Sequence, residues 1–110
     1  MQHLTAQEIE VISDIKSALS NLLGDHAFRF ILFGSKARGD FDANSDLDLA
    51  IIVDGLDRTL KRAIYDAIAD VELKHLNPVS ALVLSSDDFG GLVARERRIA
   101  LDIMNEGVAL

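Results

Sequence analysis

The sequence of 110 residues contains no cysteine. Disulfide bonds, thiolate metal sites and a cysteine nucleophile are therefore excluded. No apolar run approaches the roughly 20 residues that a membrane-spanning helix needs, and the first residues lack the basic and apolar regions of a secretory signal peptide. We therefore expect a soluble, cytoplasmic protein with no membrane segment.

Basic residues are also scarce, because 11 lysines and arginines stand against 18 aspartates and glutamates, which leaves a net charge of −7. A surface of this sign repels a nucleic-acid backbone, so direct binding of DNA or RNA is not expected. Clustered carboxylates attract divalent cations, so the composition fits metal-assisted handling of a small phosphorylated ligand. An ordinary acidic protein has the same composition, and charge alone does not decide between the two.

The chain shows no internal repeat, low-complexity tract or linker, and its 49% of hydrophobic residues suffice for one modest core. We predict a single α/β domain over residues 1–110, in the order helix–strand–strand–helix–strand–helix. Apolar periodicity and capping residues locate the elements. They are a helix between Thr5 and Gly24, strands over 27–33 and 47–53, a helix from Asp57 to about His75, a strand over 79–84, a helix capped by Ser85 or Ser86, and a last helix over 92–105 that ends at Gly107.

The first predicted strand ends in the dipeptide Gly34-Ser35. A glycine has no Cβ, so the backbone at Gly34 can approach a ligand closely. Ser35 adds a hydroxyl group, and residues 36–38 could form one helical turn with outward-facing N–H groups. Such a strand-to-helix turn favours phosphate oxygens. A plain tight turn with a serine cap has the same sequence, and for Gly-Ser alone it is the more common explanation.

Asp46 and Asp48 lie two residues apart at the start of the second predicted strand, so both point to the same face of the sheet. Two adjacent carboxylates repel each other, and one would hold a proton unless a cation lies between them. Leu47 and Leu49 fall on the opposite face and can pack under the helices. The pair therefore predicts a divalent-metal site, while two solvated carboxylates, paired with Arg38, remain the alternative.

Taken together, these residues resemble the signature of the polymerase-β-like nucleotidyltransferases, which combines a Gly-Ser turn, an Ala-Arg-Gly and an Asp-x-Asp. In this chain the signature reads Gly34-Ser35-Lys36-Ala37-Arg38-Gly39 and then Ser45-Asp46-Leu47-Asp48-Leu49. The small size is nearest to the minimal nucleotidyltransferases of bacteria and archaea, many of which are encoded beside a helical HEPN-type partner as toxin–antitoxin pairs. The resemblance covers most of the chain, although its specific residues lie within 33–49. It implies an α/β (α+β) fold with a small mixed sheet and helices packed on one face.

The resemblance also implies a mechanism. Asp46 and Asp48 would hold Mg²⁺ against the triphosphate of an NTP, which we expect to be ATP. Gly34 and Ser35 would grip the phosphates, and Arg38 would steady the loop or the phosphate charge. An acceptor hydroxyl would attack the α-phosphate while pyrophosphate leaves, and positioning and charge neutralisation supply most of the catalysis. In the paired systems of this family the acceptor can be a tyrosine hydroxyl on the HEPN-type partner.

The sequence departs from this family in one place. Active members usually carry a third carboxylate on the next strand, and the matching position here holds Ser80. A serine is neutral at pH 7, and it is a poor ligand for a hard cation and a poor base. The chain could bind nucleotide and Mg²⁺ without turnover, it could use a substitute carboxylate from Asp40, Asp42 or a partner chain, or it could act through protein contacts alone.

Three functions therefore stay open. The first is nucleotidyl transfer to a hydroxyl on a HEPN-type partner protein, and the second is a catalytically impaired antitoxin subunit that neutralises such a partner by direct binding. The third is transfer to a small molecule such as an aminoglycoside. The chain has no room for a separate acceptor domain, so this third function would require a homo-oligomer.

Other features have plain structural explanations. Lys36 follows the turn, and we expect its side chain to be solvated. Arg95, Arg97 and Arg98 form a basic cluster that is typical of a solvated helix face. Phe89 could border a docking edge, although packing of a short helix is the simpler explanation.

Overall fold

A computed structural model describes residues 4–39 and 46–110 of the chain. Its centre is a four-stranded sheet in the order β3-β2-β1-β4. The strands β1 and β2 are antiparallel, as are β1 and β4, whereas β2 and β3 are parallel. The predicted small mixed sheet is therefore confirmed. The strands are β1 (Phe28–Phe33), β2 (Leu47–Val53), β3 (Val79–Ser85) and β4 (Val108–Ala109).

Five helices are present in the described part of the chain. They are α1 (Ala6–Leu23), α2 (Gly34–Arg38), α3 (Arg58–His75), α4 (Ser86–Ala94) and α5 (Arg98–Glu106). Thr5 and Glu8 form a reciprocal capping box at the start of α1, and Asp57 accepts a hydrogen bond from Leu60 N–H at the start of α3. Of the two serines predicted to cap the next helix, Ser85 is the cap. Among the described residues no helix has the length and apolar character that crossing a membrane requires.

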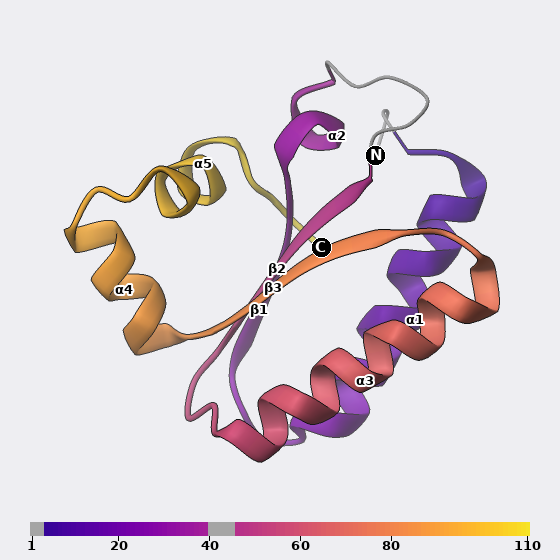
Figure 1. The fold of residues 1–110 in the computed structure, drawn as a ribbon, viewed down its shortest axis with the longest axis horizontal. Helices are drawn as coiled ribbons and strands as arrows, with labels where there is room; N and C mark the ends of the chain where they lie inside the picture. Colours follow the sequence, from indigo (N-terminus) through magenta and orange to yellow (C-terminus); the bar gives the residue numbers. More distant parts are fainter. Residues whose placement is uncertain (1–3, 40–45) are drawn as a thin grey trace.

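Helices cover both faces of the sheet, so the expectation that they pack on one face is wrong (Figure 1). The helices α1 and α3 pack on one face over an apolar cluster that includes Leu32, Leu49 and Val83. The helices α4 and α5 cover the other face over a second cluster that includes Phe33 and Ile52. The physical reason is that β1 and β2 are apolar on both sides, and a sheet of that kind must be covered twice.

The predicted last helix over 92–105 is wrong as a single element. The helix α4 runs through the two glycines at 90 and 91 and ends at Ala94, and α5 begins at Arg98. Between them Glu96 has a φ of +55°. The turn lets Phe89 from α4 and Ile103 from α5 both pack on the sheet, and that packing overrides the weak helix propensity of the glycines.

The short strand β4 was not predicted. It pairs with β1 at Ile31 and Leu32, directly after α5 ends at Gly107. A Cβ atom at Gly107 would lie 2.6 Å from Cγ2 of Ile31. The glycine therefore allows the chain to turn tightly against β1, and a stretch of two paired residues is too short to leave a sequence pattern.

Side chains from α3 cover the open edge of β3. Oε2 of Glu72 accepts a hydrogen bond from Val79 N–H at 3.0 Å, and the hydroxyl of Tyr65 accepts one from Val83 N–H at 3.2 Å. Such capping blocks further strands from adding to the edge. The Tyr65 side chain is 38% exposed, and its hydroxyl group has this polar role.

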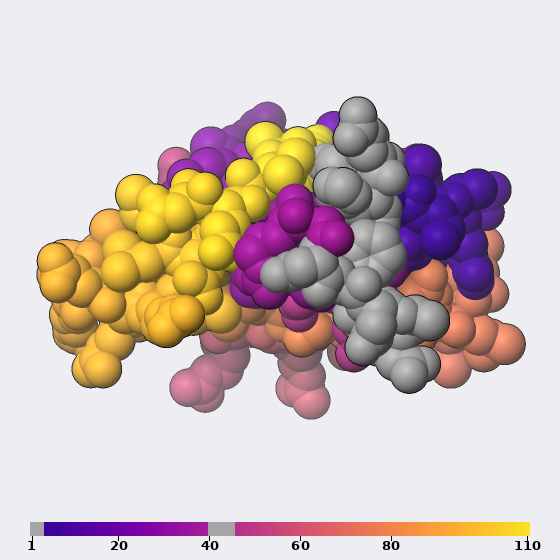
Figure 2. Space-filling model, turned by 90° about the horizontal axis from the view of Figure 1, so that it is seen from above, coloured from indigo at the N-terminus to yellow at the C-terminus, as the bar shows by residue number. Residues whose placement is uncertain are grey.

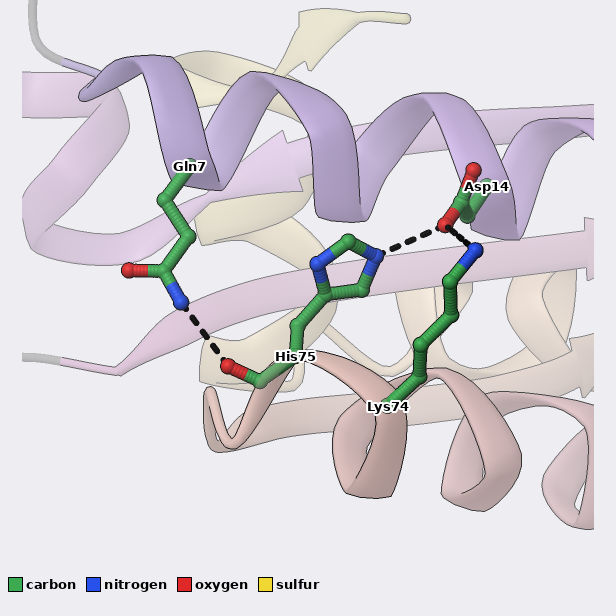
Figure 3. A network of polar contacts seen from close by, with 4 residues as sticks. All are labelled: Gln7, Asp14, Lys74 and His75. Atoms are coloured by element: carbon green, nitrogen blue, oxygen red, sulfur yellow. Dashed lines mark hydrogen bonds and ion pairs between the residues drawn. The ribbon is translucent and has the colours of Figure 1, made fainter.

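A polar cluster joins α1 to the end of α3 (Figure 3). Oδ2 of Asp14 lies 2.7 Å from Nε2 of His75 and 3.1 Å from Nζ of Lys74. The side chain of Gln7 donates to the backbone carbonyl of His75 at 2.8 Å. The hydrogen bond from His75, helped by the one from Lys74, lowers the pKa of Asp14 below its usual value of 3.8. The ionised carboxylate therefore stabilises the folded state.

We predict that Asp14→Asn lowers the midpoint of thermal unfolding at pH 7. A carboxyl with a lowered pKa contributes stability above its unfolded value and loses it as the pH falls through its folded value. The difference between wild type and variant should therefore shrink as the pH falls from 3.8 through the lowered pKa of the folded carboxyl. Asp70→Asn, an exposed change on α3, is the matched control. An equal loss at all pH values would contradict the assignment.

Candidate functional site

The register of β1 and β2 brings the predicted turn and the predicted acid pair together. Phe33 at the end of β1 lies opposite Asp48 on β2, and Gly34 follows at once as the first residue of α2. Gly34 has a φ of +75°, and a Cβ atom there would lie 3.0 Å from Cγ of Asp48 and still closer to one carboxylate oxygen. Only a glycine can occupy position 34, because the Cβ atom of any other residue would collide with this carboxylate.

Asp48 lies on the face of the sheet that α4 and α5 cover, while its neighbours Leu47 and Leu49 are fully buried under α1 and α3. Asp46 precedes β2 and is exposed, and Asp48 is half-buried. Burial, and secondarily the charge of Asp46, raises the pKa of Asp48, and the positive charge of Arg38 opposes this effect. A cation bound between the two carboxylates would relieve both unfavourable effects.

Ser80 lies beside Asp48. The two are partners in the parallel register of β2 and β3, and Ser80 is exposed. The residue at the expected third position is therefore a serine, and no set of three His, Cys, Asp or Glu that could hold a metal occurs in residues 4–39 and 46–110. Asp40 and Asp42, the suggested substitutes from the loop, lie outside the described residues.

Arg38 is bound to a residue that sequence reasoning missed. Its guanidinium group lies 2.9 Å from the Glu106 carboxylate at the end of α5, and the two side chains are 41% and 34% exposed. Arg38 therefore lies near Asp48, as its effect on the pKa of that carboxyl requires, and near a third carboxylate. No motif points to Glu106, because it meets α2 only when α5 packs beside that helix (Figure 2).

Lys36 is not solvated, and the sequence prediction for it is wrong. Its Nζ lies 3.1 Å from Oε2 of Glu8, and the two side chains are only 7% and 8% exposed. The reason is that Lys36 reaches Glu8 in the first turn of α1, and both residues are buried there. The turn residues Gly34 and Ser35 thus lie on a short helix that ion pairs connect to α1 and α5.

The other charged and aromatic candidates have structural roles. Arg98 is 93% exposed on its side chain and lies 3.7 Å from Asp102 one turn along α5, as expected of a solvated helix face. Phe89 is only 4% exposed, and the Arg29 guanidinium lies 5.1 Å above its ring. The packing interpretation of Phe89 is confirmed.

A groove of about 560 Å³ lies away from the acid pair. Its lining comes from β1, β4 and the helices at either side, and includes Phe28, Arg29, Phe89 and Met104. Neither acid nor any residue of the Gly34-Ser35 turn lines it. The mainly apolar groove is therefore separate from the polar site.

The strand register thus places the Gly34 turn directly beside Asp48 of the acid pair. Residues 13–99 match the family described as "Polymerase beta, Nucleotidyltransferase". This match covers most of the chain, and the chain belongs to that family.

Two known proteins are similar to this chain. A protein of Methanocaldococcus jannaschii named "Putative protein adenylyltransferase MJ0141" is 51% identical over 45 residues, which are 41% of this chain and 46% of that relative. The aligned stretch thus spans about half the length of this curated relative. A crystal structure described as "a putative nucleotidyltransferase from Sulfolobus solfataricus" has a TM-score of 0.50 at 18% identity, and the match covers 94% of this chain and 81% of the other. The structural match shows that the two chains share a fold.

We predict that Gly34→Ala destabilises the protein more than Gly55→Ala does. Both glycines have nearly the same positive φ, +75° and +71°, and the usual cost of an alanine there is about 1–2 kcal/mol. At Gly55 a new Cβ would meet only ordinary contacts with His26. At Gly34 it would collide with Asp48, which should add about 1–3 kcal/mol. Denaturant unfolding measures both costs, and equal values would show that the close contact with Asp48 is not a constraint.

Proposed function

We propose that this protein transfers a nucleoside monophosphate from an NTP, with ATP as the expected donor, to a hydroxyl group on a partner protein. The observation that carries the proposal is the contact between the Gly34 turn and the Asp48 carboxylate. It places the backbone of the turn next to carboxylates that suit a divalent ion. Membership in the nucleotidyltransferase family supports the reaction class.

The residues present fit Mg²⁺, because Asp46 and Asp48 supply the hard oxygen donors that this ion prefers. When bound, Mg²⁺ would neutralise the charge of the triphosphate and polarise the phosphate under attack. Gly34 and Ser35 would hold phosphate oxygens through backbone N–H groups and the serine hydroxyl. Arg38, close to Asp48, would add positive charge beside them. In the reaction an acceptor O–P bond forms at the α-phosphate, and the bond to pyrophosphate breaks.

The proposed acceptor is a protein hydroxyl, such as a tyrosine on a HEPN-type partner in the cytoplasm. The name of the M. jannaschii relative, a protein adenylyltransferase, supports a protein acceptor and ATP as donor. The aligned stretch is 46% of that relative, so donor, acceptor and partner are all part of the proposal.

A specific observation favours the alternative, a catalytically impaired antitoxin subunit that binds nucleotide and neutralises its partner by direct contact. Ser80 occupies the position on β3 beside Asp48, so no carboxylate of that strand can take the proton from an acceptor hydroxyl. Such a site could hold one metal ion with a triphosphate and still turn over slowly.

We predict that the purified protein transfers label from α-labelled ATP to its HEPN-type partner when Mg²⁺ is present. Asp48→Asn should lower the rate at least about 100-fold, because it removes a metal ligand. Asp70→Asn on α3, an equal change of charge far from the turn, is the control. If no label transfers with any variant while an Asp46→Ala/Asp48→Ala protein still neutralises the partner, the transferase is rejected and the binding subunit is supported.

We also predict that Ser80→Asp increases the transfer rate. The new carboxylate would lie beside Asp48, where it could take the acceptor proton, and a general base typically contributes at least about 100-fold. We expect a gain of about tenfold or more, because an introduced group is imperfectly placed. Ser80→Asn serves as the control, because asparagine has nearly the same size as aspartate but carries no charge. An equal rate in both variants and wild type would show that a third carboxylate is not what limits this site.

A further inference from the structure

The proposed phosphate-binding turn depends on a helix that is too short to be stable alone. The helix α2 has five residues, Gly34–Arg38, and a single turn of helix is unstable in water unless other parts of the protein hold it. Gly34 and Ser35 keep their orientation only if α2 is held. The contacts that hold α2 therefore control the geometry of the site.

Two acidic residues hold α2 from different sides. Lys36 and Arg38 are two residues apart, which is about 200° around a helix, so they leave α2 in nearly opposite directions. Lys36 reaches Glu8 on α1, and Arg38 reaches Glu106 on α5. These two helices cover opposite faces of the sheet, and Figure 2 shows the surface of α2 against that of the C-terminal part of the chain.

The two ion pairs differ in their surroundings. The Lys36–Glu8 pair is almost fully buried, whereas the side chains of Arg38 and Glu106 are more than a third exposed. Water and salt screen an exposed pair, so it contributes little. A buried pair is different, because the removal of one partner strands a charge in a medium that cannot solvate it.

Both oxygens of Glu8 are occupied. Oε1 accepts the backbone N–H of Thr5 at 2.9 Å in the capping box of α1, and Oε2 lies 3.1 Å from Lys36 Nζ. The hydrogen bond from Thr5 therefore orients the carboxylate, and this orientation directs Oε2 toward Lys36. One side chain thus couples the first turn of α1 to the helix that carries the proposed phosphate site.

We propose that Glu8 is a positioning residue of the nucleotide site, which acts through Lys36 to hold α2 so that Gly34 and Ser35 face the phosphates. This inference rests on the proposed function, because it concerns the same site. Glu8 does not touch the nucleotide. Its effect appears in nucleotide affinity and in the order of α2.

The variant Glu8→Gln tests the proposal. Glutamine preserves the size of the side chain and can still complete a capping box, so the variant removes the charge that faces Lys36 and leaves the start of α1 intact. We expect the affinity for Mg²⁺–ATP, measured by calorimetry, to fall about tenfold. Hydrogen–deuterium exchange of the segment 34–39 should become faster. Glu10→Gln, an exposed change on the same helix with the same loss of charge, should alter neither quantity.

A double-mutant cycle with Lys36→Gln shows whether Glu8 acts through Lys36. If it does, Glu8→Gln should have no further effect on affinity in the Lys36→Gln background. All measurements are made well below the unfolding midpoint of each variant, so that a general loss of stability does not change the affinity. Binding by Glu8→Gln equal to the wild type, or an effect that persists in full without Lys36, overturns the positioning role. If the wild-type protein itself binds no Mg²⁺–ATP, the proposed function fails, and the positioning role fails with it.

Discussion

The candidate site depends on the register between β1 and β2. In this antiparallel pair Phe33 lies opposite Asp48, so Gly34, which follows directly after β1, lies against the carboxylate on the neighbouring strand. A shift by one residue would turn Asp48 into the core and expose Leu47 or Leu49, which are fully buried. The burial of these leucines therefore holds the register, and the register places the acids beside the turn. The packing of the core and the geometry of the site consequently depend on the same strand register.

The Asp48 carboxyl lies in an environment that disfavours its ionised form. Burial and the neighbouring charge of Asp46 raise the pKa of Asp48, which means that its ionised form is less stable in the folded chain than in water. A buried structural carboxylate would normally be paired with a cation or hydrogen-bonded. Carboxyl groups with a raised pKa are common at functional sites, although structural networks of charges also produce them.

The two faces of the sheet differ in the side chains that they bury. The α1 and α3 face contains most of the large buried aliphatic side chains, and the Asp14 cluster joins those two helices at one end. The α4 and α5 face contains a smaller apolar cluster and also the acid pair. The short helix α2 forms one ion pair with α1, on the first face, and one with α5, on the second. The position of Ser80 on β3 separates this chain from the three-carboxylate arrangement that its sequence otherwise resembles.

By itself the sequence determined the local features of this protein. Alternating and continuous apolar runs gave β1, β2 and β3, the caps at Thr5 and Asp57 gave the starts of α1 and α3, and the turn and acid pair were visible as neighbours in a short motif. These features depend on residues close in the chain, so periodicity and spacing report them. Only the tertiary structure decided that helices cover both faces, that α4 and α5 are separate, and that Lys36 is buried against Glu8 and Arg38 bound to Glu106. Those contacts join residues that are far apart in the chain, and their energy comes from packing and desolvation that exist only once the sheet has formed.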